Sequence, residues 1–292
     1  MPLVTRLLLM TLLASLLAAC SPTAAFNQLA LARAGGVQVT RDQAYGDHPR
    51  QRLDVYAPRE VAPPRPVLVF IHGGSWNSGD KFTYAFAGAA FADEGFVTIA
   101  PNYRLTPEVR YQGFLQDSAQ AVRWARDNAR RFGGDPERIV IVGHSAGAYN
   151  AAMLALDPRW LQDAGVPRSA VKAWAGLAGP YDFLPLDDPA TIAAFSGAPD
   201  LPDTQPVNHV DRSDPPAFLA TGTDDTTVEP RHTRELAARL TAAGVPVESR
   251  FYPGVGHVGV ASALGPLFGG RAPVRQDVVR FLQSRTAQPP SA

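Results

Sequence analysis

The sequence predicts an α/β fold in which a mostly parallel sheet is covered by helices on both faces. Short runs of β-branched and other apolar residues alternate with longer amphipathic segments, the pattern of parallel strands joined by helices. The strand-like runs are continuous rather than alternating, as at 67–71 between Pro66 and Gly73. Such continuity indicates strands buried on both faces. The 292 residues, 46% hydrophobic and 18% charged, suffice for one domain of this kind.

Each strand of the predicted sheet is a short apolar run bounded by turn or charged residues. The first lies near Val37. The others are expected at 67–71, 96–100, 139–142, 171–177, 217–221 and 247–252.

Helical spacing fills several intervals between these strands. Leu115, Ala119, Val122, Ala125, Ala129 and Phe132 fall on one stripe, with arginines on the opposite side, and Gly133 ends the helix. Further helices are expected at 146–156, 230–243 and 274–284.

Charge excludes one class of partner. The 27 Lys and Arg balance the 27 Asp and Glu, so the chain has no basic field that would gather nucleic-acid phosphates. We therefore expect no nucleic-acid partner, and nothing in the sequence indicates an oligomeric state.

The N-terminus has the pattern of an export signal. Arg6 precedes an apolar run at 7–19 that is short for a membrane span but suits a signal peptide. The sequence Leu-Ala-Ala-Cys at 17–20 resembles the lipobox of bacterial lipoproteins, which implies lipid attachment at Cys20, the only cysteine. The alternative is a plain secretory peptide. We expect an exported cell-envelope protein anchored to a membrane, with Ser21 favouring the outer one.

The pattern divides the chain into four parts. Residues 1–19 are the expected signal peptide, 20–50 a tether with the first strand, 51–285 the catalytic domain and 286–292 a tail. Within the domain, 185–216 is rich in Pro and Asp with little periodicity. This stretch is expected to be either a short cap over a site or an irregular surface loop.

Ser145 is the candidate nucleophile. It lies in Gly-His-Ser-Ala-Gly at 143–147, directly after a predicted buried strand and before a predicted helix. A hydroxyl needs a base and a stabilised anion to act as a nucleophile. A sharp strand-to-helix turn with flanking glycines exposes the serine and directs the helix N-terminus at developing negative charge.

A second glycine turn follows the strand at 67–71. Its sequence, His-Gly-Gly-Ser-Trp at 72–76, can direct backbone N–H groups at an oxyanion. It resembles the oxyanion-hole motif of carboxylesterases related to hormone-sensitive lipase, and more closely the His-Gly-Gly-x-Trp form of smaller esterases and kynurenine formamidases. These enzymes have the α/β-hydrolase fold. The resemblance extends from about Leu53 to Gly259.

The resemblance implies roles for the residues in both turns. Gly74 and Ser75 would donate their N–H groups to the oxyanion together with Ala146, and Trp76 would line the substrate pocket. His72 would be structural. Ser75 stands where the lipase branch has a third glycine, which retains the N–H group but narrows the space beside it.

His257 is the candidate general base. In this fold the triad follows the chain order serine, acid, histidine, and His257 lies in a glycine-framed loop after the strand at 247–252. His232 falls in the first turn of a predicted helix and is expected to be a solvated surface residue.

Asp225 is the candidate acid, with Asp224 as the alternative. Gly-Thr-Asp-Asp-Thr-Thr-Val at 222–228 resembles the family's Gly-x-x-Asp-x-x-Val segment, and its register selects Asp225. The carboxylate would hold the histidine in its useful tautomer. Asp224 would then cap a turn or face solvent.

These residues predict a serine hydrolase that cleaves small carboxylic esters. Hydrolysis of arylformamides or other amides is the nearest alternative, because it uses the same residues. A hydrolase scaffold that only binds a ligand is the alternative from another class. No metal-ligand spacing and no phosphate loop is present, so we expect no metal and no cofactor.

Overall fold

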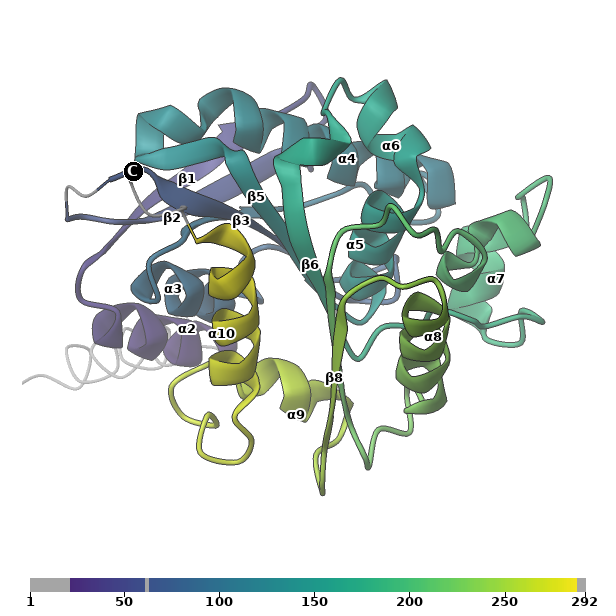
Figure 1. Ribbon diagram of the computed structural model, residues 1–292. Coiled ribbons are helices and arrows are strands. Elements are labelled where there is room, and N and C mark those ends of the chain that lie inside the picture. Colours follow the sequence, from purple (N-terminus) through teal and green to yellow (C-terminus); the bar gives the residue numbers. More distant parts are fainter. Residues whose placement is uncertain (1–21, 61–62, 288–292) are drawn as a thin grey trace, which may run out of the picture.

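An eight-stranded sheet lies at the centre of the computed structural model, which describes residues 22–60 and 63–287 (Figure 1). The strand order is β1-β2-β4-β3-β5-β6-β7-β8. The pairs β1–β2 and β2–β4 are antiparallel and the other five are parallel, which confirms the mostly parallel sheet. The strands are β1 Val37–Ala44, β2 Arg52–Pro58, β3 Arg65–Ile71, β4 Val97–Pro101, β5 Gly134–His144, β6 Val171–Leu177, β7 Ala217–Gly222 and β8 Val247–Tyr252.

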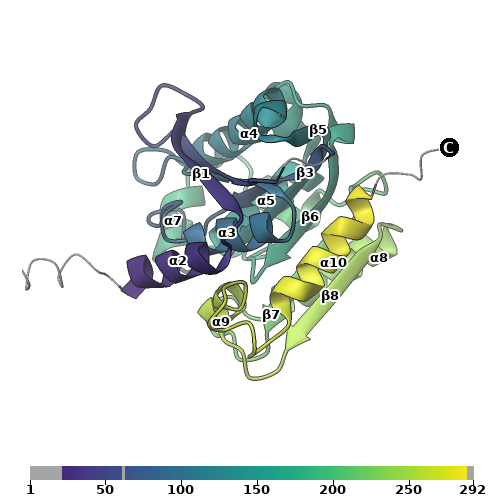
Figure 2. The same ribbon diagram turned by 90° about the vertical axis from the view of Figure 1, so that its left-hand side faces the viewer.

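Helices cover both faces of the sheet (Figures 1 and 2). One face carries α2 Pro22–Arg33, α3 Ala85–Asp93, α9 His257–Ser262 and α10 Val274–Thr286. The other carries α4 Tyr111–Asn128, α5 Ala146–Leu156, α6 Pro158–Asp163, α7 Pro189–Phe195 and α8 Arg231–Ala242. Short 3₁₀ helices span Ala129–Phe132, Arg168–Ala170, Pro202–Thr204 and Pro206–Asn208.

The central strands supply side chains to both cores, which explains their continuous apolar sequence. In β3, Val67, Val69 and Ile71 pack into the core beneath α4 and α5, whereas Leu68 and Phe70 point to the core beneath α3 and α10. Successive strand residues point to opposite faces. A strand with helices on both sides therefore needs apolar residues at every position.

Elements β2 and α3 are among those that were not predicted, because each lacks the periodicity that indicates its type. In β2, the apolar pattern is interrupted by Asp54, which is buried and paired with Lys81 at 2.7 Å. Every residue of α3 from Ala85 to Ala92 is buried. A helix that is buried all round shows no amphipathic stripe in its sequence.

The segment after Ser21, which we expected to be a tether, contains helix α2, and α2 packs beside α3 (Figures 1 and 2). Asn27 is buried and donates to the Phe82 carbonyl at 2.6 Å, and its side-chain oxygen accepts from the Phe86 N–H at 3.0 Å. The ring of Phe26 also packs against Phe86 and Phe268. The helix is therefore held by one polar side chain together with apolar contacts to distant segments, which hydropathy patterns do not reveal.

Cys20 and the predicted signal peptide lie outside the described residues. Among the residues that are described, no helix has both the length and the apolar character needed to cross a bilayer.

The stretch at 185–216 is neither a long lid nor wholly irregular. It contains α7 and two 3₁₀ turns. Asp188 caps α7 by accepting from the N–H groups of Ala190 and Thr191 at 2.8 and 3.3 Å. Phe195, at the end of α7, is buried in the core.

Candidate active site

Ser145 lies in a sharp turn between β5 and α5. Its backbone has φ 56° and ψ −124°, a conformation that non-glycine residues adopt only when the surrounding structure imposes it. A Cβ at Gly143 would lie 2.1 Å from the Gly147 carbonyl oxygen, and one at Gly147 would lie 2.1 Å from the Ile71 oxygen. Both glycines are therefore required by close backbone packing, and together they hold the serine at the end of the strand.

The structure brings Ser145, His257 and Asp225 together in one line of hydrogen bonds. Ser145 Oγ lies 2.9 Å from His257 Nε2, and His257 Nδ1 lies 2.8 Å from Asp225 Oδ2. Because the carboxylate only accepts, Nδ1 carries the proton and Nε2 is left to accept from the serine hydroxyl. This is the tautomer that a general base needs.

Asp225 follows β7 and is 3% exposed. Its Oδ1 accepts from the N–H groups of Thr227 and Val228 at 3.0 and 2.8 Å. Burial raises the pKa of the carboxyl, but the hydrogen bonds from His257 and Val228 outweigh burial and hold the pKa below its usual value. Asp224 is exposed, and within the part of the chain that the structure describes its side chain accepts a hydrogen bond only from the Thr223 hydroxyl, so the geometry favours Asp225.

The loop after β3 presents backbone N–H groups beside the serine. Gly74, Ser75 and Trp76 have φ values of 123°, 50° and 58°, and the Gly74 carbonyl oxygen accepts from Ser78 N and Oγ, both at 2.9 Å. Among the described residues, the N–H groups of Gly74, Ser75 and Ala146 have no acceptor.

A cavity of about 440 Å³ opens over these donors. Ser75, Trp76, Ser145 and Ala146 line it, whereas Gly74 does not. Trp76 is 3% exposed, and its indole N–H donates to Asn150 Oδ1 at 3.1 Å. Ser75 and Ala146 thus belong to the wall of the cavity, and Trp76 forms an apolar part of the wall beside them.

Sequence reasoning missed a hydrogen-bond chain through His144. Its Nε2 donates to the His257 carbonyl oxygen at 3.1 Å, and its Nδ1 accepts from the Tyr84 hydroxyl at 2.9 Å. Burial lowers the pKa of His144 to about 3 and raises that of Tyr84 to about 12, so both are neutral at physiological pH. These hydrogen bonds connect the turn that carries Ser145 with the loop that carries His257.

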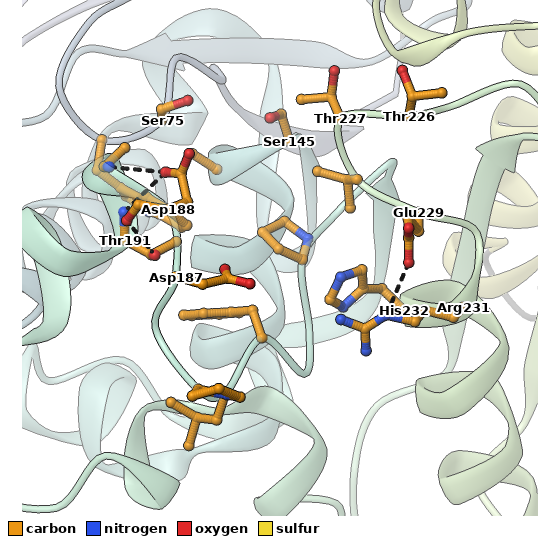
Figure 3. A pocket seen from close by; sticks show the side chains of 18 residues that line it. Ser75, Ser145, Asp187, Asp188, Thr191, Thr226, Thr227, Glu229, Arg231 and His232 are labelled. Atoms are coloured by element: carbon orange, nitrogen blue, oxygen red, sulfur yellow. Dashed lines mark hydrogen bonds and ion pairs between the residues drawn. The ribbon is translucent and has the colours of Figure 1, made fainter.

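His232 is not the solvated surface residue that the sequence predicted. The residue is 6% exposed, and it lines the cavity together with Thr226, Thr227 and Glu229 (Figure 3). The first turn of α8 faces the segment at 180–182 rather than solvent, because that segment crosses in front of it. No periodicity in the sequence reveals such a crossing.

The segment at 183–191 forms another part of the cavity wall. Phe183, Pro185, Asp187 and Thr191 all line the cavity (Figure 3). This segment therefore forms one side of the cavity. Within residues 22–60 and 63–287, no group of three His, Cys, Asp or Glu side chains lies close enough to hold a metal ion.

Comparison with known proteins identifies the family of this chain. A family model described as BD-FAE matches residues 53–240. The chain belongs to the BD-FAE family.

Two curated relatives of this BD-FAE chain are described as esterases. A rice protein described as a probable isoprenylcysteine α-carbonyl methylesterase is 30% identical over 86% of this chain. Esterase LipC of Mycobacterium tuberculosis is 31% identical over 73% of it. The chain spans 65% and 58% of the lengths of these relatives, less than two-thirds of either.

Solved structures similar to this BD-FAE chain share its fold. Esterase B from Lactobacillus rhamnosis, inhibited by a tributyrin phosphonate, has a TM-score of 0.76 at 22% identity, covering 95% of this chain and 96% of that one. A truncated carbohydrate esterase from gut microbiota has a TM-score of 0.75 at 21% identity, covering 86% and 97%.

Proposed function

We propose that this protein is a serine hydrolase that cleaves small carboxylic esters. The observation that carries the proposal is the line from Ser145 through His257 to Asp225, with hydrogen bonds of 2.9 and 2.8 Å. The esterase descriptions of the relatives support an ester rather than an arylformamide as substrate. A cavity of about 440 Å³ suits a small ester.

In the first step, Ser145 Oγ attacks the ester carbonyl carbon while His257 Nε2 takes the hydroxyl proton. Asp225 stabilises the imidazolium that forms and keeps its ring in place. The negative charge on the tetrahedral intermediate is stabilised by the N–H groups of Gly74, Ser75 and Ala146, which have no acceptor among the described residues. Donors fixed before the reaction cost no reorganisation, and each is worth about 2.7–4 kcal/mol.

In the second step, the imidazolium returns its proton to the leaving alcohol and the acyl group stays on the serine. Water then loses a proton to His257 and attacks the acyl carbon. The acid leaves and Ser145 regains its proton.

The test is covalent labelling of the serine combined with turnover. A fluorophosphonate probe should label the wild-type protein at Ser145, and Ser145→Ala should lose the label. The same variant should lower kcat for p-nitrophenyl acetate by about 10⁴-fold or more. A folded wild-type protein that neither labels nor hydrolyses the ester would overturn the proposed catalysis.

We propose further that the protein is exported and anchored to a membrane of the cell envelope through Cys20. The apolar run at 7–19 and the single cysteine after Leu-Ala-Ala support this. The mass of the mature N-terminal peptide tests it. A lipid-modified Cys20 is expected, and an unmodified peptide that begins after Cys20 would exclude anchoring.

A further inference from the structure

His232 has one ring nitrogen occupied by the protein. Nδ1 faces the backbone N–H groups of Tyr181 and Asp182 at 3.3 and 3.2 Å. Both neighbours are donors, so Nδ1 must hold a lone pair and the ring proton resides on Nε2. The backbone at 181–182 thus fixes the tautomer of His232.

The other ring nitrogen is a donor without a protein acceptor. No hydrogen bond from Nε2 exists among the described residues, although the residue is 6% exposed and lines the cavity over Ser145. Protonation of Nδ1 would direct an N–H donor at the backbone N–H groups of Tyr181 and Asp182, which are donors themselves. Burial and the charge of Arg231 lower the pKa of His232 to about 4, which agrees with a neutral ring.

The cavity also offers acceptors to a group bound at His232. The carboxylates of Asp187 and Glu229 line the same cavity (Figure 3), and Asp187 has no hydrogen-bond partner among the described residues. Glu229 is paired with Arg231 at 3.2 Å. A hydroxyl group matches this arrangement because it accepts from an imidazole N–H and donates to a carboxylate, whereas a methyl group would leave both unpaired.

We propose that Nε2–H of His232 donates a hydrogen bond to a substrate hydroxyl, which makes His232 a specificity-determining residue for hydroxylated esters. The inference rests on the proposed ester hydrolysis. The hydroxyl belongs either to the alcohol part or to the acyl part of the ester, and substrates can distinguish the two.

Pairs of esters that differ only by a hydroxyl in place of a methyl group provide the test. For the alcohol part, acetates of hydroxyalkyl alcohols with two to four carbons are compared with the corresponding alkyl acetates. For the acyl part, methyl 3-hydroxypropanoate is compared with methyl butanoate, and methyl 6-hydroxyhexanoate with methyl heptanoate. The quantity measured is the ratio of kcat/KM within each pair.

Two variants separate recognition from structural support. His232→Asn keeps an acceptor near Nδ1 for the backbone N–H groups but removes the pocket donor. His232→Gln places an amide N–H near Nε2 but leaves the backbone groups without their acceptor. His48→Asn is the matched control, because His48 Nδ1 also accepts from a backbone N–H, that of Arg50 at 3.1 Å, outside the cavity.

We expect at least one pair to favour the hydroxylated ester by about three- to tenfold more in the wild type than in His232→Asn. His232→Gln should keep more of that preference than His232→Asn, and His48→Asn should keep all of it. Dividing wild-type by variant ratios cancels the intrinsic reactivity of the esters.

Two results would overturn the inference while leaving ester hydrolysis intact. One is a wild-type enzyme whose ratios equal those of His232→Asn in every pair. The other is a His232→Gln variant that loses more preference than His232→Asn, which is the order expected of a structural histidine. Loss of Ser145-dependent p-nitrophenyl acetate hydrolysis in the wild type would instead remove the proposed function itself.

Discussion

The turns that carry Ser145, Asp225 and His257 differ in construction from the segments that form the wall of the cavity. The turns depend on backbone approaches that only glycine permits, such as the contact of Gly147 with the Ile71 carbonyl. The wall segments at 180–191 and 226–232 instead meet through side chains such as His232. The turns therefore constrain backbone positions to glycine, whereas the wall is shaped by the identity of its side chains.

The largest expected effect lies in the turns. Asp225→Asn should lower kcat for p-nitrophenyl acetate by about 10⁴-fold, because an amide donor favours the wrong tautomer of His257. Asp224→Asn, one residue away and exposed, should change kcat less than twofold. Steady-state kinetics of the two variants measure this directly, and equal losses would remove Asp225 from the proposed triad.

A smaller effect is expected from Tyr84→Phe, which interrupts the hydrogen-bond chain to His144. The His257 loop would lose part of its orientation, so kcat should fall about tenfold with little change in KM. Tyr252→Phe is the control. The hydroxyl of the buried Tyr252 donates to Asp277 Oδ2 at 3.0 Å, and neither residue belongs to the proposed triad. A similar fall in kcat for the control, or a change confined to KM, would contradict a positioning role.

The serine turn and the cavity wall each contain a buried neutral histidine, and the pH dependence of the free energy of unfolding should show both. His144 in a turn and His232 in the wall have pKa values lowered from 6.5 to about 3 and about 4. The unfolded chain therefore binds more protons below pH 6.5, and stability should fall as the pH decreases from about 6.5 toward 4, by up to about 1.4 kcal/mol per pH unit for each histidine.

Urea unfolding at pH 7, 6 and 5 measures this dependence. His144→Gln and His232→Asn should each reduce the change in unfolding free energy with pH. Only His144→Gln should also lower kcat for p-nitrophenyl acetate. A pH dependence as steep in both variants as in the wild type would show that neither histidine is neutral and buried.

The smallest effect is expected in the wall. Asp188→Ala removes the N-cap of α7 and should destabilise that helix by about 1 kcal/mol. KM should rise about two- to fivefold while kcat stays within twofold, because α7 is not part of the reacting turns. Asp188→Asn retains a capping oxygen and should restore KM. An equal loss in kcat would mean that the wall also positions the triad.

The sequence predicted every strand of the sheet except β2, because the signals of these strands are local. It also selected Ser145, His257 and Asp225, which the structure brings within hydrogen-bond distance of one another. The runs at 171–177 and 247–252 match β6 and β8, and the helix at 146–156 matches α5. Each signal depends only on neighbouring residues. The boundaries of β5 were less accurate, since its polar first half at 134–138 lacks apolar residues.

Features that depend on distant segments could not be predicted. His232 is buried because the chain at 181–182 donates to it across fifty positions, and His144 bridges Tyr84 and His257 from two further elements. Helix α2 is held by Asn27 against the segment at 82–86. Such pairings leave no trace in a local pattern of apolar and polar residues.

The docking of α2 has a consequence for the geometry of the protein at a membrane. Helix α2 begins at Pro22 and packs against α3, so only two residue steps separate it from Cys20. Two extended residues span about 7 Å. The proposed anchoring through Cys20 would therefore hold the protein at the surface of the bilayer rather than at the end of a long stalk.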